Sequence, residues 1–116
     1  MDSQYQLELK SQQNNKIYSF ESADGIYSKK SFRDEEILLA DQVLVKKSDK
    51  ILVIQSGFGF LGTVLGDNAD KVTMYETSAR ASQFSKKNAE NNQIENFQVV
   101  NKPERSDIEE SFDKIL

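Results

Sequence analysis

The sequence predicts an α/β domain built on an open parallel sheet. Short apolar runs rich in β-branched residues, such as Ile51-Leu52-Val53-Ile54, are typical of strands buried on both faces. Segments with helical periodicity alternate with these runs, and strands alternating with helices imply right-handed crossovers and parallel pairing. The predicted strands cover residues 51–54, 71–75, 97–100 and 112–116, and the helices between them cover 60–65 and 78–92. We therefore expect three or four parallel strands.

A hairpin and a helix are predicted before this sheet. Apolar and polar residues alternate over 5–9 and again over 17–20, and a polar, Asn-containing run separates the two stretches, which indicates an antiparallel hairpin. Ser31, with Asp34 three residues on, fits a helix N-cap, and we expect a helix over 32–46. The chain is thus divided into an N-terminal hairpin segment, residues 1–30, and a partial sheet domain, residues 31–116.

Composition excludes several classes of function. The chain has 116 residues, which fits one small domain, and its net charge of −4 disfavours a protein that coats nucleic acid. It contains no Cys and no His, so disulfides, thiolate or imidazole metal ligands and histidine-based triads are excluded, and no metal site is predicted. No apolar run approaches the length of a membrane span, and we expect a cytoplasmic protein without a membrane partner.

A glycine-rich turn and an acid point to a cofactor site. Gly57, Gly59 and Gly62 follow the first parallel strand, and Glu76 closes the second. Glycine allows a sharp turn and lets a ligand approach the backbone, while an acid in this place accepts hydrogen bonds from ribose hydroxyls. A glycine-rich connector with a solvated Glu is the structural alternative. Nicotinamide dinucleotides, flavins and S-adenosylmethionine all use this corner of such sheets.

The residues after Glu76 distinguish between these three classes of cofactor. The stretch Glu76-Thr77-Ser78, the small Ala81 and an Asn-rich helix end from Asn88 resemble class I S-adenosylmethionine-dependent methyltransferases of the small-domain group. Gly25-Ile26-Tyr27-Ser28 and Phe112-Asp113-Lys114-Ile115 are similar to segments of ribosomal RNA guanine-N2 methyltransferases. The resemblance covers roughly residues 25–116 and implies a partial Rossmann-like domain with S-adenosylmethionine as cofactor.

The resemblance also implies which residues contact the cofactor. Glu76 would hold the ribose, Asn101 would reach the adenine, and Phe58 would line the pocket, with a core position where helix meets sheet as the alternative for Phe58. Tyr27 would stack on the cofactor, with a partly buried surface aromatic as the alternative. The expected cofactor-binding residues are Tyr27, Gly57, Phe58, Gly59, Gly62, Glu76, Thr77 and Asn101.

Two departures from the family pattern shape the functional prediction. Val53 and Gln55 stand where the family has a strand acid and a Gly, and Pro103 is the only proline, so no Asn-Pro-Pro-Tyr motif is present. We assign no catalytic residue. The chain is expected to be the cofactor-binding half of a methyltransferase acting on RNA or, less favoured, protein, and to be inactive alone. The alternatives are a catalytically inactive scaffold or interaction module of the same fold, and a fragment of a nicotinamide-dependent oxidoreductase.

The last predicted strand suggests a partner. Phe112, Ile115 and Leu116 would lie on a sheet edge, where unpaired backbone groups invite another strand. We expect a homodimer or a partner chain to cover this edge.

Overall fold

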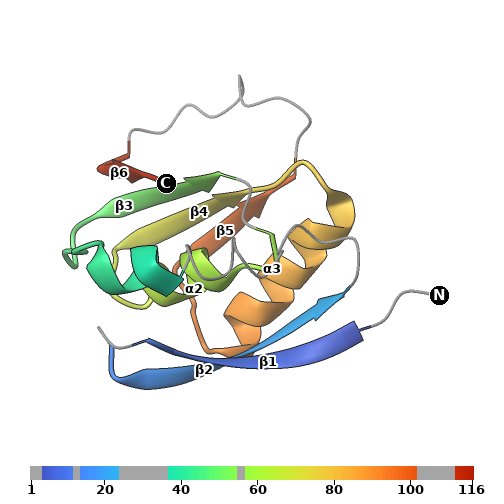
Figure 1. Ribbon diagram of the computed structural model, residues 1–116. Coiled ribbons are helices and arrows are strands. Elements are labelled where there is room, and N and C mark those ends of the chain that lie inside the picture. The colour runs from blue at the N-terminus through green and yellow to red at the C-terminus, as the bar shows by residue number, and fades with distance from the viewer. Residues whose placement is uncertain (1–3, 12–13, 24–36, 55–56, 102–111) are drawn as a thin grey trace.

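The computed structural model describes residues 4–11, 14–23, 37–54, 57–101 and 112–116 (Figure 1). A four-stranded sheet lies on one side of the molecule, a two-stranded hairpin on the other, and helices lie between them. The elements are β1 (Gln4–Ser11), β2 (Lys16–Ala23), β3 (Lys50–Ile54), α2 (Phe60–Gly66), β4 (Lys71–Tyr75), α3 (Ala79–Asn91), β5 (Phe97–Val100) and β6 (Lys114–Ile115). Residues 37–42 are helical as well.

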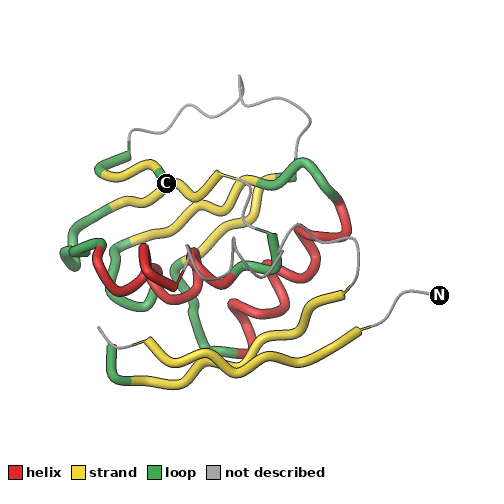
Figure 2. Tube along the Cα trace, viewed as in Figure 1, coloured by secondary structure: helices red, strands yellow, loops and turns green. Residues whose placement is uncertain are grey.

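The larger sheet confirms the predicted parallel architecture. Its strand order is β5-β4-β3-β6, and each neighbouring pair is parallel. Figure 2 shows the helical crossovers that connect β3 to β4 and β4 to β5 on the same side of the sheet. Ile54 pairs with Tyr75 in register, so β3 and β4 end at the same edge. Strand β6 forms the outer edge beside β3, as the sequence predicted for the last apolar segment.

The hairpin is also confirmed, whereas one helix boundary is wrong. Strands β1 and β2 pair antiparallel, and the turn places Asn15 at φ 49°, a left-handed conformation that Asn tolerates. Within the described residues, the helix predicted over 32–46 ends at Gln42. Val43 and Val45 pack against the core while Leu44 is exposed, and this alternation suits extended backbone rather than a helix. The predicted cap at Ser31 and Asp34 lies outside the described residues.

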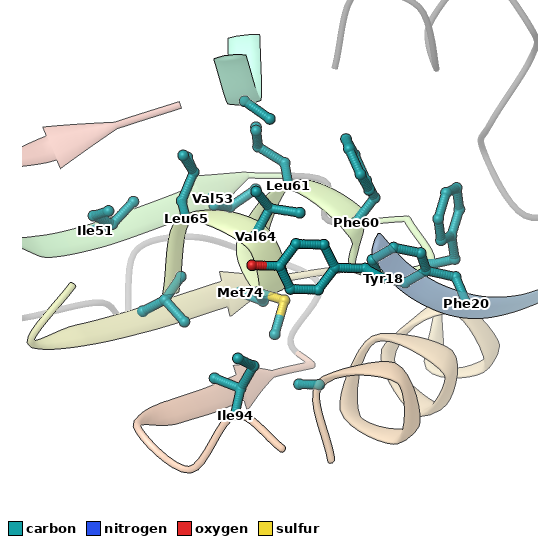
Figure 3. Close-up of a cluster of buried hydrophobic side chains, with 14 of the residues drawn as sticks. Tyr18, Phe20, Ile51, Val53, Phe60, Leu61, Val64, Leu65, Met74 and Ile94 are labelled. Atoms are coloured by element: carbon teal, nitrogen blue, oxygen red, sulfur yellow. The ribbon is translucent and has the colours of Figure 1, made fainter. Parts of the chain in front are cut away.

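One hydrophobic cluster joins the layers (Figure 3). The hairpin contributes Tyr18 and Phe20, which pack with residues of α2, β3 and β4. On α3, Ala81 and Ala89 are buried and Phe84 is half-buried. Among the residues that the structure describes, no helix combines the length and the apolar character needed to span a membrane.

Candidate functional site

Glu76 connects the ends of two neighbouring strands. It follows β4, is only 5% exposed, and its Oε1 accepts a hydrogen bond from the backbone N–H of Gly57 at 3.0 Å, just beyond β3. Its Oε2 accepts a second bond from the backbone N–H of Ser78 at 3.0 Å. The sequence separated Gly57 and Glu76 by 19 positions, and the parallel pairing of β3 and β4 brings them into contact.

The carboxylate keeps acceptor capacity beyond these two bonds. An ionised carboxylate has about four lone-pair sites, and the backbone bonds use one on each oxygen. Asn101 lies at the same edge, where its Nδ2 donates to the main-chain oxygen of Glu76 at 2.8 Å. The structure therefore brings together three of the predicted residues, Gly57, Glu76 and Asn101, at the carboxyl ends of the strands, where open α/β sheets bind ligands.

The predicted glycines serve two different purposes. Gly57 and Gly59 have φ values of 59° and 92°, a left-handed conformation that side chains with a Cβ disfavour. A Cβ on Gly59 would also lie 2.8 Å from the Cα of Ser85 on α3. Gly62 lies inside α2, where its missing side chain admits Met74 of β4. The first two glycines therefore shape the turn, and the third allows close packing of helix on sheet.

Side chains of α3 support the turn from behind. Ser78 caps this helix, with its Oγ accepting from the N–H of Ala81 at 3.2 Å. Ser85 Oγ donates to the carbonyl of Gly57 at 2.8 Å, and Asn88 Nδ2 donates to the carbonyl of Phe58 at 2.6 Å. Sequence reasoning missed Ser85. The available signal was a row of polar residues three apart, Ser82, Ser85 and Asn88, on the face of α3 that also carries Ala81 and Ala89.

The remaining predicted residues lie in different surroundings. The ring of Phe58 is 1% exposed and meets Phe20 edge-on at 5.5 Å, so it occupies the core position that the sequence left open as an alternative. Thr77 is exposed between β4 and α3. Tyr27 lies outside the described residues. In the part of the chain that the structure describes, no three acidic residues cluster as a metal site would require.

A surface hollow of about 640 Å³ lies elsewhere. Asp70 and Asn96, which line it, precede β4 and β5, so it opens at the amino ends of these strands, away from Glu76. Asn96 Nδ2 donates to the carbonyls of Gly66 and Ala69 at 3.0 and 2.8 Å. The polar side chain of Asn96 therefore stabilises the turn between α2 and β4. The hollow is separate from the candidate cofactor site.

Comparisons with known proteins agree with this fold. A family model described as methyltransferase small domain matches residues 17–116. The structure of TYW2 from M. jannaschii in complex with AdoMet superposes with a TM-score of 0.73 at 15% identity, covering 84% of this chain and 46% of that one. The tRNA m1G37 methyltransferase of M. jannaschii superposes with a TM-score of 0.72 at 17% identity, covering 84% and 31%.

A dimethyladenosine transferase from Plasmodium falciparum gives a TM-score of 0.61 at 24% identity, covering 78% of this chain and 32% of that one. At these identities, the superpositions confirm the fold. The chain spans between 31% and 46% of the length of these three proteins.

Proposed function

The chain belongs to the methyltransferase small-domain family, and we propose that it forms the S-adenosylmethionine-binding part of a methyltransferase. The observation that carries this proposal is the bond between Gly57 and Glu76, which places a left-handed glycine turn and a buried carboxylate side by side at the carboxyl edge of the sheet. A ribose-bearing ligand uses both features. Its ribose hydroxyls donate hydrogen bonds to the acid, and the rest of the ligand passes close to the backbone of the glycine turn.

Each residue of the site has a proposed role. Glu76 accepts hydrogen bonds from the ribose hydroxyls through the lone pairs that Gly57 and Ser78 leave free. Asn101 presents its Oδ1 to the adenine amine, since its Nδ2 is bonded to the protein. Thr77 and Tyr27 complete the proposed set, and Phe58 contributes its backbone. When bound, the cofactor supplies an activated methyl group, and the protein contributes its orientation.

RNA is the proposed class of methyl acceptor, with a protein amide as the alternative. Support comes from one of the similar folds, which is a tRNA methyltransferase. Catalytic groups remain unassigned. A homodimer or partner chain is proposed at β6, because this strand forms an edge of the sheet and Ile115 is 61% exposed there. An inactive scaffold of the same fold is the second candidate, favoured by Val53, which is buried where the family has a strand acid.

Calorimetry tests the cofactor proposal. The protein is titrated with S-adenosylhomocysteine, S-adenosylmethionine and NAD, and the titrations are repeated with Glu76→Ala and with Glu90→Ala, an exposed acid on α3. We expect micromolar binding of the two adenosyl ligands, no heat with NAD, loss of binding in Glu76→Ala and unchanged binding in Glu90→Ala. If circular dichroism shows the wild-type protein to be folded and no binding heat is measured with any of the three ligands, the scaffold function is supported instead.

A further inference from the structure

Asn88 joins three segments of the chain with one buried amide. It is 0% exposed on α3, and its Oδ1 accepts from the N–H of Glu21 at 2.8 Å while its Nδ2 donates to the carbonyl of Glu21 at 2.8 Å. The same Nδ2 also donates to the carbonyl of Phe58 at 2.6 Å. Asn88 therefore links strand β2 of the hairpin, helix α3 and the glycine turn.

Ser85 binds the preceding carbonyl of the same turn, that of Gly57. It lies one helical turn before Asn88, is 0% exposed, and donates its Oγ proton to the carbonyl of Gly57 at 2.8 Å. Two consecutive carbonyls, those of Gly57 and Phe58, are thus held from α3. Glu76 holds the N–H of Gly57 from the other side, so both peptide groups that flank this glycine are fixed.

Asn92 provides a natural comparison. It lies one turn after Asn88 on the same face of α3 and grips β2 in the same manner, accepting from the N–H of Ser19 at 3.1 Å and donating to its carbonyl at 2.8 Å. Its further bond, at 2.8 Å, goes to the carbonyl of Asn88 in its own helix. Asn92 thus fastens the hairpin in the way Asn88 does, without a bond to the glycine turn.

We propose that Ser85 and Asn88 are positioning residues for cofactor binding, an inference that rests on the proposed function. A turn with two left-handed glycines has many accessible conformations, because glycine restricts its backbone least. Apparent affinity falls in proportion to the fraction of molecules in the binding-competent conformation. By holding two carbonyls of the turn before the ligand arrives, Ser85 and Asn88 raise that fraction.

The test compares Ser85→Ala, Asn88→Ala and Asn92→Ala with the wild-type protein, using S-adenosylhomocysteine as the calorimetric probe well below each melting temperature. Loss of one hydrogen bond to the turn predicts affinity weaker by about tenfold in the first two variants. Asn92→Ala is expected to lower the melting temperature and to leave the affinity unchanged. In parallel, the ¹⁵N–¹H resonances of Gly57 and Gly59 should shift in Ser85→Ala and Asn88→Ala, and stay in place in Asn92→Ala.

The possible results separate the two proposals. If the folded wild-type protein gives no heat, the proposed function fails and this inference fails with it. If the wild-type protein binds and Ser85→Ala and Asn88→Ala bind equally well, only the positioning role is overturned. Equal weakening in Asn92→Ala and Asn88→Ala would overturn it too, because hairpin docking alone would then explain the effect. Ser85→Ala removes a single hydroxyl and keeps the test decisive if Asn88→Ala does not fold.

Discussion

Gly62 of α2 faces Met74 of β4 so closely that a Cβ on the glycine would lie 2.5 Å from the Met74 Cγ. Met74 is 0% exposed in the centre of the core, so its side chain has little room to yield. Gly62→Ala should therefore destabilise the fold by about 1–3 kcal/mol through overpacking. The helix-propensity gain of about 1 kcal/mol offsets part of this overpacking cost, so the net destabilisation is up to about 2 kcal/mol. Urea unfolding measures the difference.

A second substitution checks the cause. In the double variant Gly62→Ala, Met74→Val, the smaller side chain on β4 makes room for the new methyl group. We expect the double variant to be more stable than the sum of the two single effects predicts, as neighbouring sites that share a cavity couple. Strict additivity of the two effects would show that the contact between α2 and β4 does not decide the stability.

Gly59→Ala should behave differently. The obstacle there is the Cα of Ser85, 2.8 Å from the built Cβ, and the residue sits at φ 92°, where a side chain is strained whatever the space. The backbone of Ser85 can shift even less than the confined side chain of Met74, so we expect a larger loss of stability than in Gly62→Ala. Met74→Val should give no recovery. Urea unfolding of the two alanine variants side by side tests this order, and an equal loss in both would contradict it.

The three glycines show how far the sequence could predict this site. Their spacing, together with the strand before them, was sufficient to predict the turn and to place Glu76 at the end of the neighbouring strand, whereas the bond between Gly57 and Glu76 was found only in the structure. Spacing could not distinguish Gly57 and Gly59, which adopt left-handed backbone, from Gly62, which admits a side chain from another strand. That distinction depends on tertiary packing, which no local pattern records.

The same reason explains two other differences. The helix that ends at Gln42 was predicted to continue because Val43 fits a helical apolar stripe as well as an extended one. Ser85 and Asn88 look like ordinary polar helix residues in the sequence, and only the fold shows that their partners are carbonyls from segments 28 to 67 positions away. Strands with uniform apolar runs, such as β3, were predicted closely because their burial is continuous.

The hydrogen-bonded hydroxyl of Tyr18 leads us to expect that the folded protein loses stability at alkaline pH. Its hydroxyl donates to Asp67 Oδ2 at 2.6 Å and accepts from Asn14 Nδ2 at 2.8 Å. Burial, followed by the hydrogen bond to Asp67, raises the pKa of Tyr18 well above its usual value of 10.0. The unfolded chain therefore loses this proton at lower pH than the folded protein does. The stability that the protonated Tyr18 hydroxyl contributes is fully present below pH 10.0, and it is lost as pH rises toward the pKa of Tyr18 in the folded protein.

Tyr18→Phe removes this titration. At neutral pH we expect a loss of about 1 kcal/mol, since the bonds to Asp67 and Asn14 disappear while Lys16 still pairs with Asp67 at 3.1 Å. Urea unfolding between about pH 8 and pH 11 should show a shallower alkaline decline in the variant. Parallel declines in variant and wild type would mean that other groups control the alkaline limb.

Two buried hydroxyls offer sites for stabilisation. Thr63 on α2 and Thr73 on β4 are 0% and 1% exposed, and neither Oγ1 finds a hydrogen-bond partner among the described residues. Replacing a buried unpaired hydroxyl with a methyl group removes a desolvation cost of about 1–3 kcal/mol. Thr63→Val and Thr73→Val should each raise the melting temperature, whereas Thr77→Val, at an exposed position, should not. A lower melting temperature in Thr63→Val would indicate that its hydroxyl bonds a buried water.

The ion pair between Asp49 and Lys114 leads us to expect that the edge strand β6 detaches at acid pH. Its carboxylate lies 2.7 Å from Lys114 Nζ of β6 and accepts from the N–H of Lys46 at 2.9 Å. The bond to Lys114, followed by that to Lys46, holds the pKa of Asp49 below its usual value of 3.8. The unfolded chain then binds this proton first as pH falls. Stability from the pair is present above pH 3.8 and is lost as pH drops through the folded pKa.

Hydrogen exchange at β6 reports this loss locally. The N–H of Leu116 donates to the carbonyl of Leu52 at 2.8 Å, and its protection depends on β6 staying paired with β3. We expect protection at Leu116 to fall between about pH 4 and pH 2 in the wild type, because protonation of Asp49 releases Lys114. In Asp49→Asn the protection should be weaker at neutral pH and nearly independent of pH. Asp113→Asn, which alters an exposed carboxylate of the same segment, should retain the acid dependence. If it abolished that dependence and Asp49→Asn did not, Asp113 would be the group that fastens the edge strand.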